Sequence, residues 1–149
     1  MARGRFSERE PDLDSAVDMA AFTAQSIGSS AAATFVVAVD GTIVSWSDEA
    51  ARLFRRPAWD AVGRPCHEVV GGLELDGTEG CTEKCPIRLQ CRLGVAPPSR
   101  DLLAPRSPGA DADRMLRVHH VTLNDPLGYV AGVLHVVEPV AHPHRSRPT

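Results

Sequence analysis

The chain has 149 residues, of which 43% are hydrophobic and 23% are charged, and its formal net charge is −3. This length and composition are those of one globular domain with a buried core, and they exclude two domains or a largely disordered chain. The 16 basic residues are scattered along the sequence, which excludes a nucleic-acid-binding surface. Because the sequence shows no export signal and no long apolar run, we expect a cytoplasmic protein with no membrane contact.

Residues 1–29 are expected to form a polar tail followed by a helix. Residues 1–10 are polar and charged, and Asp12 or Asp14 can cap a helix that extends from about residue 13 to residue 27. The apolar stripe of this helix consists of Leu13, Val17, Ala20, Ala24 and Ile27. We expect the stripe to pack on the domain's own sheet or on another subunit.

A β-hairpin is predicted next. Residues 34–39 (TFVVAV) are a β-branched run typical of a buried strand, and the Asp40-Gly41 dipeptide that follows is a strong tight-turn signal. Residues 42–46 (TIVSW) alternate as a returning strand does. We expect Trp46, together with Trp59, to pack in the core.

Short helices are predicted in the middle of the chain. Ser47 precedes the acidic start of a helix over residues 48–54, and residues 58–70 read as two brief helical turns separated by Gly63. Pro65 is acceptable at a first helical position. A glycine-rich loop follows, and then residues 82–93 can be helical, although Pro86 limits where that helix begins.

Two further strands are predicted after a proline-rich connection. They cover residues 115–123 and 129–137, and residues 124–128 (NDPLG) turn the chain between them. Residues 139–149 are proline-rich and polar, so we expect a disordered tail. Two hairpins on either side of a helical middle indicate an antiparallel sheet with helices on one face, which is an α+β architecture.

The order of these elements resembles a PAS domain. Residues 35–70 are similar to the amino-terminal half of the family, with a strand, an Asp-Gly turn, a second strand and a Ser-Asp-Glu-Ala-Ala helix, and residues 117–138 resemble its last two strands. The resemblance implies that residues 30–138 form a five-stranded antiparallel sheet with flanking short helices, enclosing a pocket for haem, flavin, an iron-sulphur cluster or a small metabolite.

That resemblance also implies a role in signal transduction or transcriptional regulation. The domain would report to a second copy of itself or to a signalling partner such as a kinase or a transcription regulator. Flavin photosensors of the family carry an Asn-Cys-Arg-Phe-Leu type motif that is absent here, where Asn124 is the only asparagine. The chain also lacks a phosphate-binding glycine loop and a nucleophile elbow, so we expect no catalytic residues and no enzyme activity.

The four cysteines are the strongest chemical signal. Cys66, Cys81, Cys85 and Cys91 have the spacing C-x14-C-x3-C-x5-C, and a chain without an export signal should keep them reduced. Thiolates are soft ligands, so we expect these four residues to bind an iron-sulphur cluster. Zinc, a thiol-disulphide switch and unrelated buried thiols remain alternatives. On a helix, Cys81 and Cys85 would share one face.

Histidines offer a haem alternative. His67 follows Cys66 on a middle helix, where haem-binding members of the family place a ligand, and Cys85-Pro86 resembles a haem-regulatory dipeptide. His119 and His120 are neighbours on a predicted strand, so at most one of them faces the pocket. His135 reads as a hydrogen-bonded core histidine. The other alternative is a cofactor-free PAS module for dimerisation or protein interaction.

Overall fold

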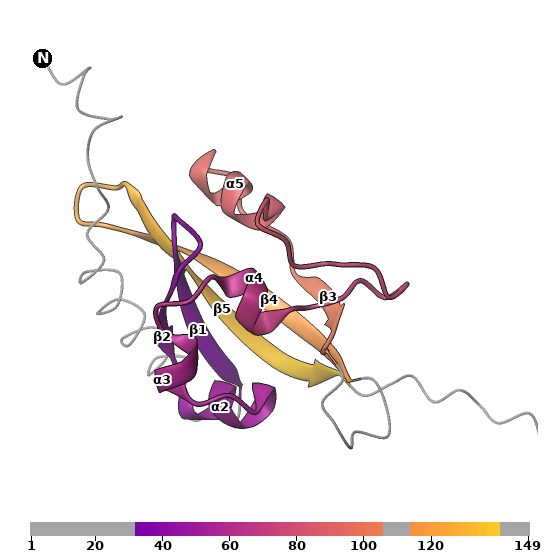
Figure 1. Ribbon diagram of the computed structural model, residues 1–149. Coiled ribbons are helices and arrows are strands. Elements are labelled where there is room, and N and C mark those ends of the chain that lie inside the picture. Colours follow the sequence, from indigo (N-terminus) through magenta and orange to yellow (C-terminus); the bar gives the residue numbers. More distant parts are fainter. Residues whose placement is uncertain (1–31, 106–113, 141–149) are drawn as a thin grey trace, which may run out of the picture.

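The computed structural model describes residues 32–105 and 114–140. In these residues one five-stranded antiparallel sheet, of strand order β2-β1-β5-β4-β3, carries short helices on one face (Figure 1). The elements are β1 Ala33–Ala38, β2 Ile43–Trp46, α2 Asp48–Phe54, α3 Ala58–Ala61, α4 Cys66–Val70, α5 Pro86–Arg92, β3 Arg100–Leu103, β4 Met115–Asn124 and β5 Val130–Val140. The predicted α+β class is confirmed, while the helix expected over residues 13–27 lies outside the described residues.

Strands β1 and β2 form the predicted hairpin. The Asp40 carboxylate accepts a hydrogen bond from the Thr42 backbone N–H at 2.9 Å, and Gly41 has a φ of 94°. A glycine suits this turn because side chains disfavour positive φ. Phe35 pairs with Trp46 across the two strands.

The Ser47 hydroxyl connects the hairpin to α2. Its oxygen accepts hydrogen bonds from the backbone N–H groups of Ala50 and Thr34, both at 3.0 Å, so one side chain caps the helix and ties it to β1. The helix ends at Arg55, whose φ of 53° lies in the left-handed region. The predicted helix over residues 48–54 is therefore confirmed together with its cap.

Prolines set the starts of the remaining helices. Pro57 and Pro65 precede α3 and α4 as cap residues, and Pro86 is the first residue of α5. Within the segment 82–93, where Pro86 was expected to limit the start, the helix begins at Pro86 itself, because proline fits a helix start but not the interior. Cys81 and Cys85 thus both precede α5, and the prediction that they share a helix face was wrong.

The five-stranded antiparallel sheet that the resemblance implied is confirmed, and its strand β3 and the end of β5 are the parts that the sequence pattern did not locate. β3 lies between prolines in the segment predicted as a connection. It pairs with β4 along its length and forms an isolated bridge to Leu73 through Leu103. β5 continues to Val140, so the expected tail does not begin at residue 139. Among the residues that the structure describes, β1 pairs with β5 only as far as Val137 and Pro139 lies opposite β4, a position in which proline is tolerated.

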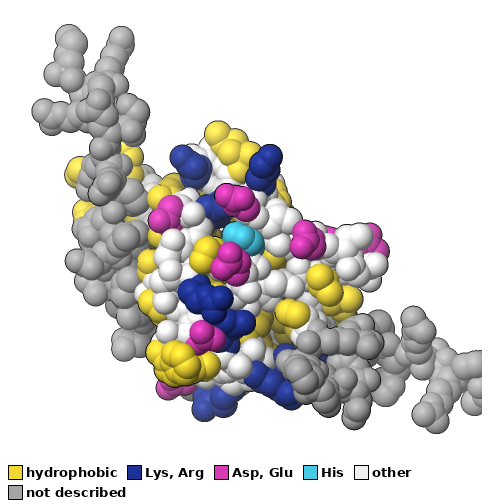
Figure 2. All heavy atoms as spheres, in the orientation of Figure 1, with side chains coloured by type: hydrophobic (Ala, Val, Ile, Leu, Met, Phe, Trp, Pro, Cys, Tyr) yellow, Lys and Arg dark blue, Asp and Glu magenta, His cyan; other side chains and the backbone are white. Residues whose placement is uncertain are grey.

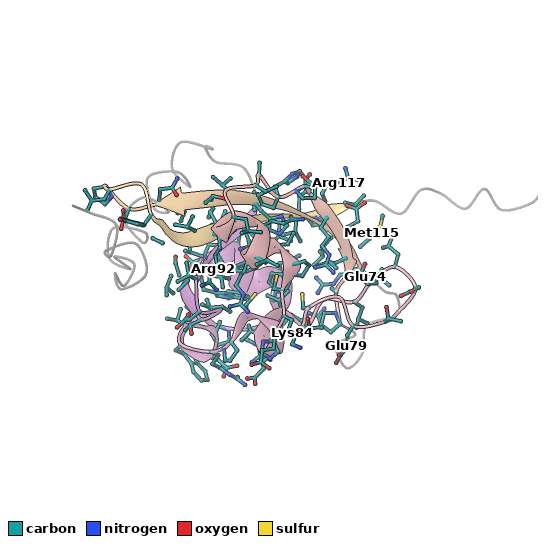
Figure 3. The ribbon with its side chains drawn as sticks, turned by 90° about the horizontal axis from the view of Figure 1, so that it is seen from above. Glu74, Glu79, Lys84, Arg92, Met115 and Arg117 are labelled. Atoms are coloured by element: carbon teal, nitrogen blue, oxygen red, sulfur yellow. The ribbon has the colours of Figure 1, made fainter. Side chains whose placement is uncertain are left out.

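The core lies between the sheet and the helices. Phe35, Ile43 and Trp46 are buried in it together with Val70, Leu102 and Val118. Trp59 is 84% exposed, so the prediction that it packs in the core was wrong. Viewed from above, Lys84 and Glu79 lie on the side of the covering segments away from the sheet (Figure 3).

The surface over the helices has no single dominant charge. Figure 2 shows basic and acidic side chains interspersed on this face, with apolar groups between them. None of the helices in the described part of the chain has the length and apolar character to cross a membrane.

Candidate functional site

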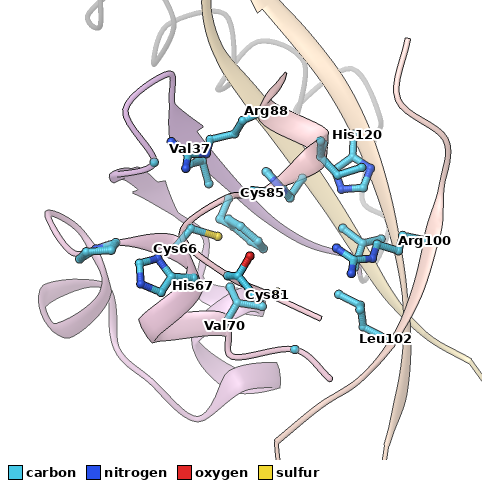
Figure 4. A pocket seen from close by; sticks show the side chains of 18 of the residues that line it. Val37, Cys66, His67, Val70, Cys81, Cys85, Arg88, Arg100, Leu102 and His120 are labelled. Atoms are coloured by element: carbon cyan, nitrogen blue, oxygen red, sulfur yellow. The ribbon is translucent and has the colours of Figure 1, made fainter. Parts of the chain in front are cut away.

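A cavity of about 170 Å³ lies between the sheet and the segments that cover it. Its wall includes Phe35, Cys66, Cys81, Cys85, Arg100 and His120. Figure 4 shows Cys66 and His67 on one side of this pocket and Arg100, Leu102 and His120 on the other. Three of the four predicted cysteine ligands and the predicted His67 therefore line the same cavity.

Cys66 is the first residue of α4, and the hairpin turn holds it in place. Its backbone N–H donates to the Gly41 carbonyl oxygen at 2.8 Å, next to a bridge between Thr42 and Pro65. Burial raises the pKa of the Cys66 thiol well above its ordinary value, and the nearby thiols of Cys81 and Cys85 raise it further. Burial therefore favours the protonated form of this thiol over the thiolate.

Cys81 lies at the end of a loop that is fastened to β3. The Cys81 backbone N–H donates to the Gly72 carbonyl oxygen at 2.9 Å, and Leu73 and Leu103 exchange two backbone hydrogen bonds. A Cβ atom at Gly72 would lie 3.1 Å from the Cys81 sulphur, so glycine allows this close approach. Burial raises the pKa of the Cys81 thiol, while a hydrogen bond from Gly72 and the charge of Arg100 oppose that shift.

Cys85 caps α5, and Arg88 of that helix reaches across to the hairpin turn. The Arg88 guanidinium donates to the carbonyl oxygens of Val39 at 3.2 Å and Glu83 at 2.5 Å. It also lies against Gly41, where a Cβ atom would be only 2.7 Å from the guanidinium nitrogen. Arg88 therefore fastens the segment that carries Cys85 to the opposite rim of the cavity.

Cys91 does not line this cavity. Its side chain is 1% exposed and packs with Ile87 and Val133 in a separate apolar cluster. The Thr122 hydroxyl donates a hydrogen bond to the Cys91 sulphur at 3.3 Å. The structure thus gathers three of the four predicted thiols and leaves Cys91 in the core.

Histidines line the sheet side of the cavity. Phe35, His135 and His120 face one another across the adjacent strands β1, β5 and β4, and all three line the pocket. The outward-facing neighbour His119 instead contacts Ser99 and Glu138, which confirms that only one residue of the His119-His120 pair faces the pocket. His135 is buried as predicted, and burial lowers its pKa to about 3. Its position on the pocket wall was missed by sequence reasoning.

The fit of a metal or cofactor follows from these positions. Among residues 32–105 and 114–140, no three Cys, His, Asp or Glu side chains form a group that could hold a single metal ion. The cavity is also smaller than the roughly 300–1,000 Å³ typical of pockets for drug-sized ligands, so haem or flavin would require it to open.

No family model and no curated protein matches the sequence. Solved structures do match the fold. A PAS domain from Colwellia psychrerythraea has a TM-score of 0.57 at 14% identity, covering 82% of this chain and 97% of that one. The PAS domain of an HTR-like protein from Haloarcula marismortui has a TM-score of 0.54 at 15% identity, covering 83% of this chain and 98% of that one.

A light-oxygen-voltage domain, solved in a study of a flavin analogue, matches with a TM-score of 0.57 at 20% identity, over 87% of this chain and 88% of its own. A PAS domain from a two-component sensor histidine kinase has a TM-score of 0.54 at 11% identity, over 80% of this chain and 95% of its own. With its five-stranded antiparallel sheet, this chain has the fold of PAS domains.

Proposed function

We propose that this domain is a PAS-type sensor that holds an iron-sulphur cluster in its cavity and reports the state of that cluster to a signalling partner. The observation that carries the proposal is the position of Cys66, Cys81 and Cys85 around one cavity. Cys66 begins α4, whereas Cys81 and Cys85 lie in the stretch that leads to α5, so a group that binds all three would connect these two segments. A PAS domain from a sensor histidine kinase among the structural neighbours supports the signalling role.

The arrangement of the donors favours a cluster over zinc. A zinc ion needs four ligand atoms at about 2.0–2.3 Å from one point. The described residues contain no such group of three or more donors, which argues against a single zinc ion. An iron-sulphur cluster distributes its ligands over different iron atoms, and it supplies a reversible one-electron change.

The protein's own residues would position and shield the group. Arg88 fastens the Cys85 segment over the hairpin turn, and Arg100 donates a hydrogen bond to the Gly80 carbonyl oxygen at 2.7 Å while pairing with Glu74. These contacts hold two of the thiols at the cavity. The buried aromatic and aliphatic wall, including Phe35 and Leu102, limits access of water.

The test is the metal content of full-length protein purified without oxygen. We expect a brown protein that contains iron and acid-labile sulphide and that bleaches in air. Serine at Cys66, Cys81 or Cys85 should remove the colour, while Cys91→Ser is the matched control and should keep it. Colourless protein without iron after anaerobic reconstitution with iron and sulphide would overturn the cluster proposal and favour a cofactor-free interaction module.

A further inference from the structure

The face of the sheet that points away from the cavity carries a second apolar cluster. Val36 of β1 pairs with Leu134 of β5, and each is the chain neighbour of a residue that lines the cavity. Because successive side chains of a strand point to opposite faces, both residues lie on the far side of the sheet. We call the apolar residues gathered there the outer-face cluster, and its members are Val36, Val44, Leu123, Leu134 and Val136.

The outer-face cluster is shielded from water. Val36 and Leu134 are each 1% exposed, and Leu123 is 2% exposed. A sheet face that is open to solvent keeps its side chains partly exposed and is usually polar. These exposed fractions are those of one chain, so no second copy is needed to explain the burial.

The described helices do not provide this cover. Helices α2, α3 and α4 contribute buried residues to the core on the cavity side. Helix α5 packs through Ile87 and Cys91 against Val133, which lies two residues from His135 and therefore on the cavity face as well. The cover of the outer-face cluster must therefore come from the chain outside residues 32–105 and 114–140.

The composition of the remaining segments identifies one candidate. Residues 106–113 (RSPGADAD) and 141–149 (AHPHRSRPT) contain no Val, Leu, Ile, Met, Phe, Tyr or Trp. Residues 13–27 instead carry the apolar stripe that runs from Leu13 to Ile27. At 3.6 residues per turn, the five residues of this stripe fall within an arc of about 80° on one side of a helix.

The lengths of these segments also fit. A helix over the 15 residues 13–27 is about 22 Å long. The outer-face cluster extends over the four adjacent strands β2, β1, β5 and β4, which at about 4.8 Å per spacing span roughly 14 Å. Residues 28–32 join the stripe to β1, and five extended residues reach about 17 Å, which is enough for the chain to fold back.

We propose that residues 13–27 form a helix that docks its apolar stripe on the outer-face cluster of the same chain. Ion pairs mark the border of the docking surface on this face. The Arg117 guanidinium pairs with Asp101 at 2.9 Å, and His119 contacts Glu138 at 3.0 Å, so these polar side chains have partners without the docked helix. The proposal does not depend on what the cavity holds.

The first experiment is a photo-cross-link in full-length protein that carries p-benzoylphenylalanine in place of Val121. This residue pairs with Leu134 across β4 and β5 and is 40% exposed, so the probe lies beside the outer-face cluster. After irradiation, mass spectrometry of the monomer band should show cross-links to residues 13–27. The matched control places the probe at Leu75, which is 58% exposed between α4 and α5 and should give no cross-link to that segment.

The second experiment changes the docking helix. Val17→Asp places a carboxylate within the stripe, whereas Phe22→Asp places it about 180° away on the same helix. Burial of an unpaired charge disfavours docking, so Val17→Asp should lower the yield of the Val121 cross-link by about tenfold or more. Phe22→Asp should keep the yield of the unchanged chain.

The possible outcomes decide the proposal. Cross-links from position 121 that join two chains, or that miss residues 13–27, would overturn it. Equal loss of cross-linking in Val17→Asp and Phe22→Asp would overturn the role of the stripe. Far-UV circular dichroism checks that both variants fold. Iron content does not enter these measurements, so a failure of the cluster proposal leaves this test unaffected.

Discussion

The aromatic cluster around Phe35 gives a quantitative test of the packing beneath the cavity. Phe35 is 2% exposed and contacts the rings of Trp46 at 5.1 Å, Phe54 at 6.1 Å and His135 at 4.5 Å between centroids. Replacement by leucine keeps an apolar side chain of similar volume but removes all three ring contacts. The Phe35→Leu variant therefore tests how much these ring contacts contribute to the free energy of unfolding.

The expected cost follows from these contacts. Each aromatic pair contributes about 0.5–1.5 kcal/mol beyond its buried area, so three pairs amount to roughly 1.5–4.5 kcal/mol. Leucine recovers part of this through its own contacts, which leaves a loss of about 2–3 kcal/mol in the free energy of unfolding. Since domains of this kind have about 5–15 kcal/mol in total, the variant should still fold.

Urea denaturation of the variant measures this cost. With a slope of about 1–3 kcal/mol per molar urea, the midpoint should fall by roughly 0.7–3 M while the slope stays unchanged. Trp59→Leu is the matched control, because Trp59 is 84% exposed and its loss should change stability by less than about 0.5 kcal/mol. If Phe35→Leu loses less than about 1 kcal/mol, or no more than Trp59→Leu, the stacked rings do not stabilise the domain as argued.

Three further predictions concern backbone packing, the thiols and the amino-terminal segment. Gly132→Ala should destabilise the domain by about 1–3 kcal/mol, because the new Cβ would lie 2.8 Å from the Val37 carbonyl oxygen, and an unchanged urea midpoint would contradict this. Gly72→Ala should lower iron uptake while the far-UV circular dichroism spectrum is retained, because the new Cβ would lie 3.1 Å from the Cys81 sulphur. If the variant binds as much iron as the wild type, the Cys81 thiol tolerates this displacement. Deletion of residues 1–28 should reduce solubility or shift the oligomer size in size-exclusion chromatography, because the predicted helix carries an apolar stripe, and a truncated protein that matches the full chain in both respects would exclude that role.

Local signals in the sequence were sufficient for much of the fold. Ser47 before two acidic residues predicted α2, and Asp40-Gly41 predicted the hairpin turn, because capping and turn formation depend on neighbouring residues. β3 was missed because its four residues lie between prolines and are specified mainly by pairing with β4. Trp59 was misplaced because aromatic character alone does not determine burial.

The candidate site was predictable only in part. Cysteine clustering drew attention to Cys66, Cys81 and Cys85, which line one cavity, but spacing could not show that Cys91 packs against Val133 instead. His135 lies on the pocket wall because it pairs with Phe35 across the sheet. Strand register, which would have revealed that pairing, depends on contacts between residues far apart in the sequence.

The way the thiols are anchored also bears on when the site can form during synthesis. Cys66 is held by the carbonyl of Gly41, and the loop of Cys81 is held through Leu73 by Leu103, a residue of the later strand β3. Non-local pairings of this kind form late, since the intervening chain must first be ordered. A nascent chain whose β3 is still inside the ribosome therefore lacks the anchor for Cys81, and assembly of the three-thiol site should follow closure of the sheet rather than guide it.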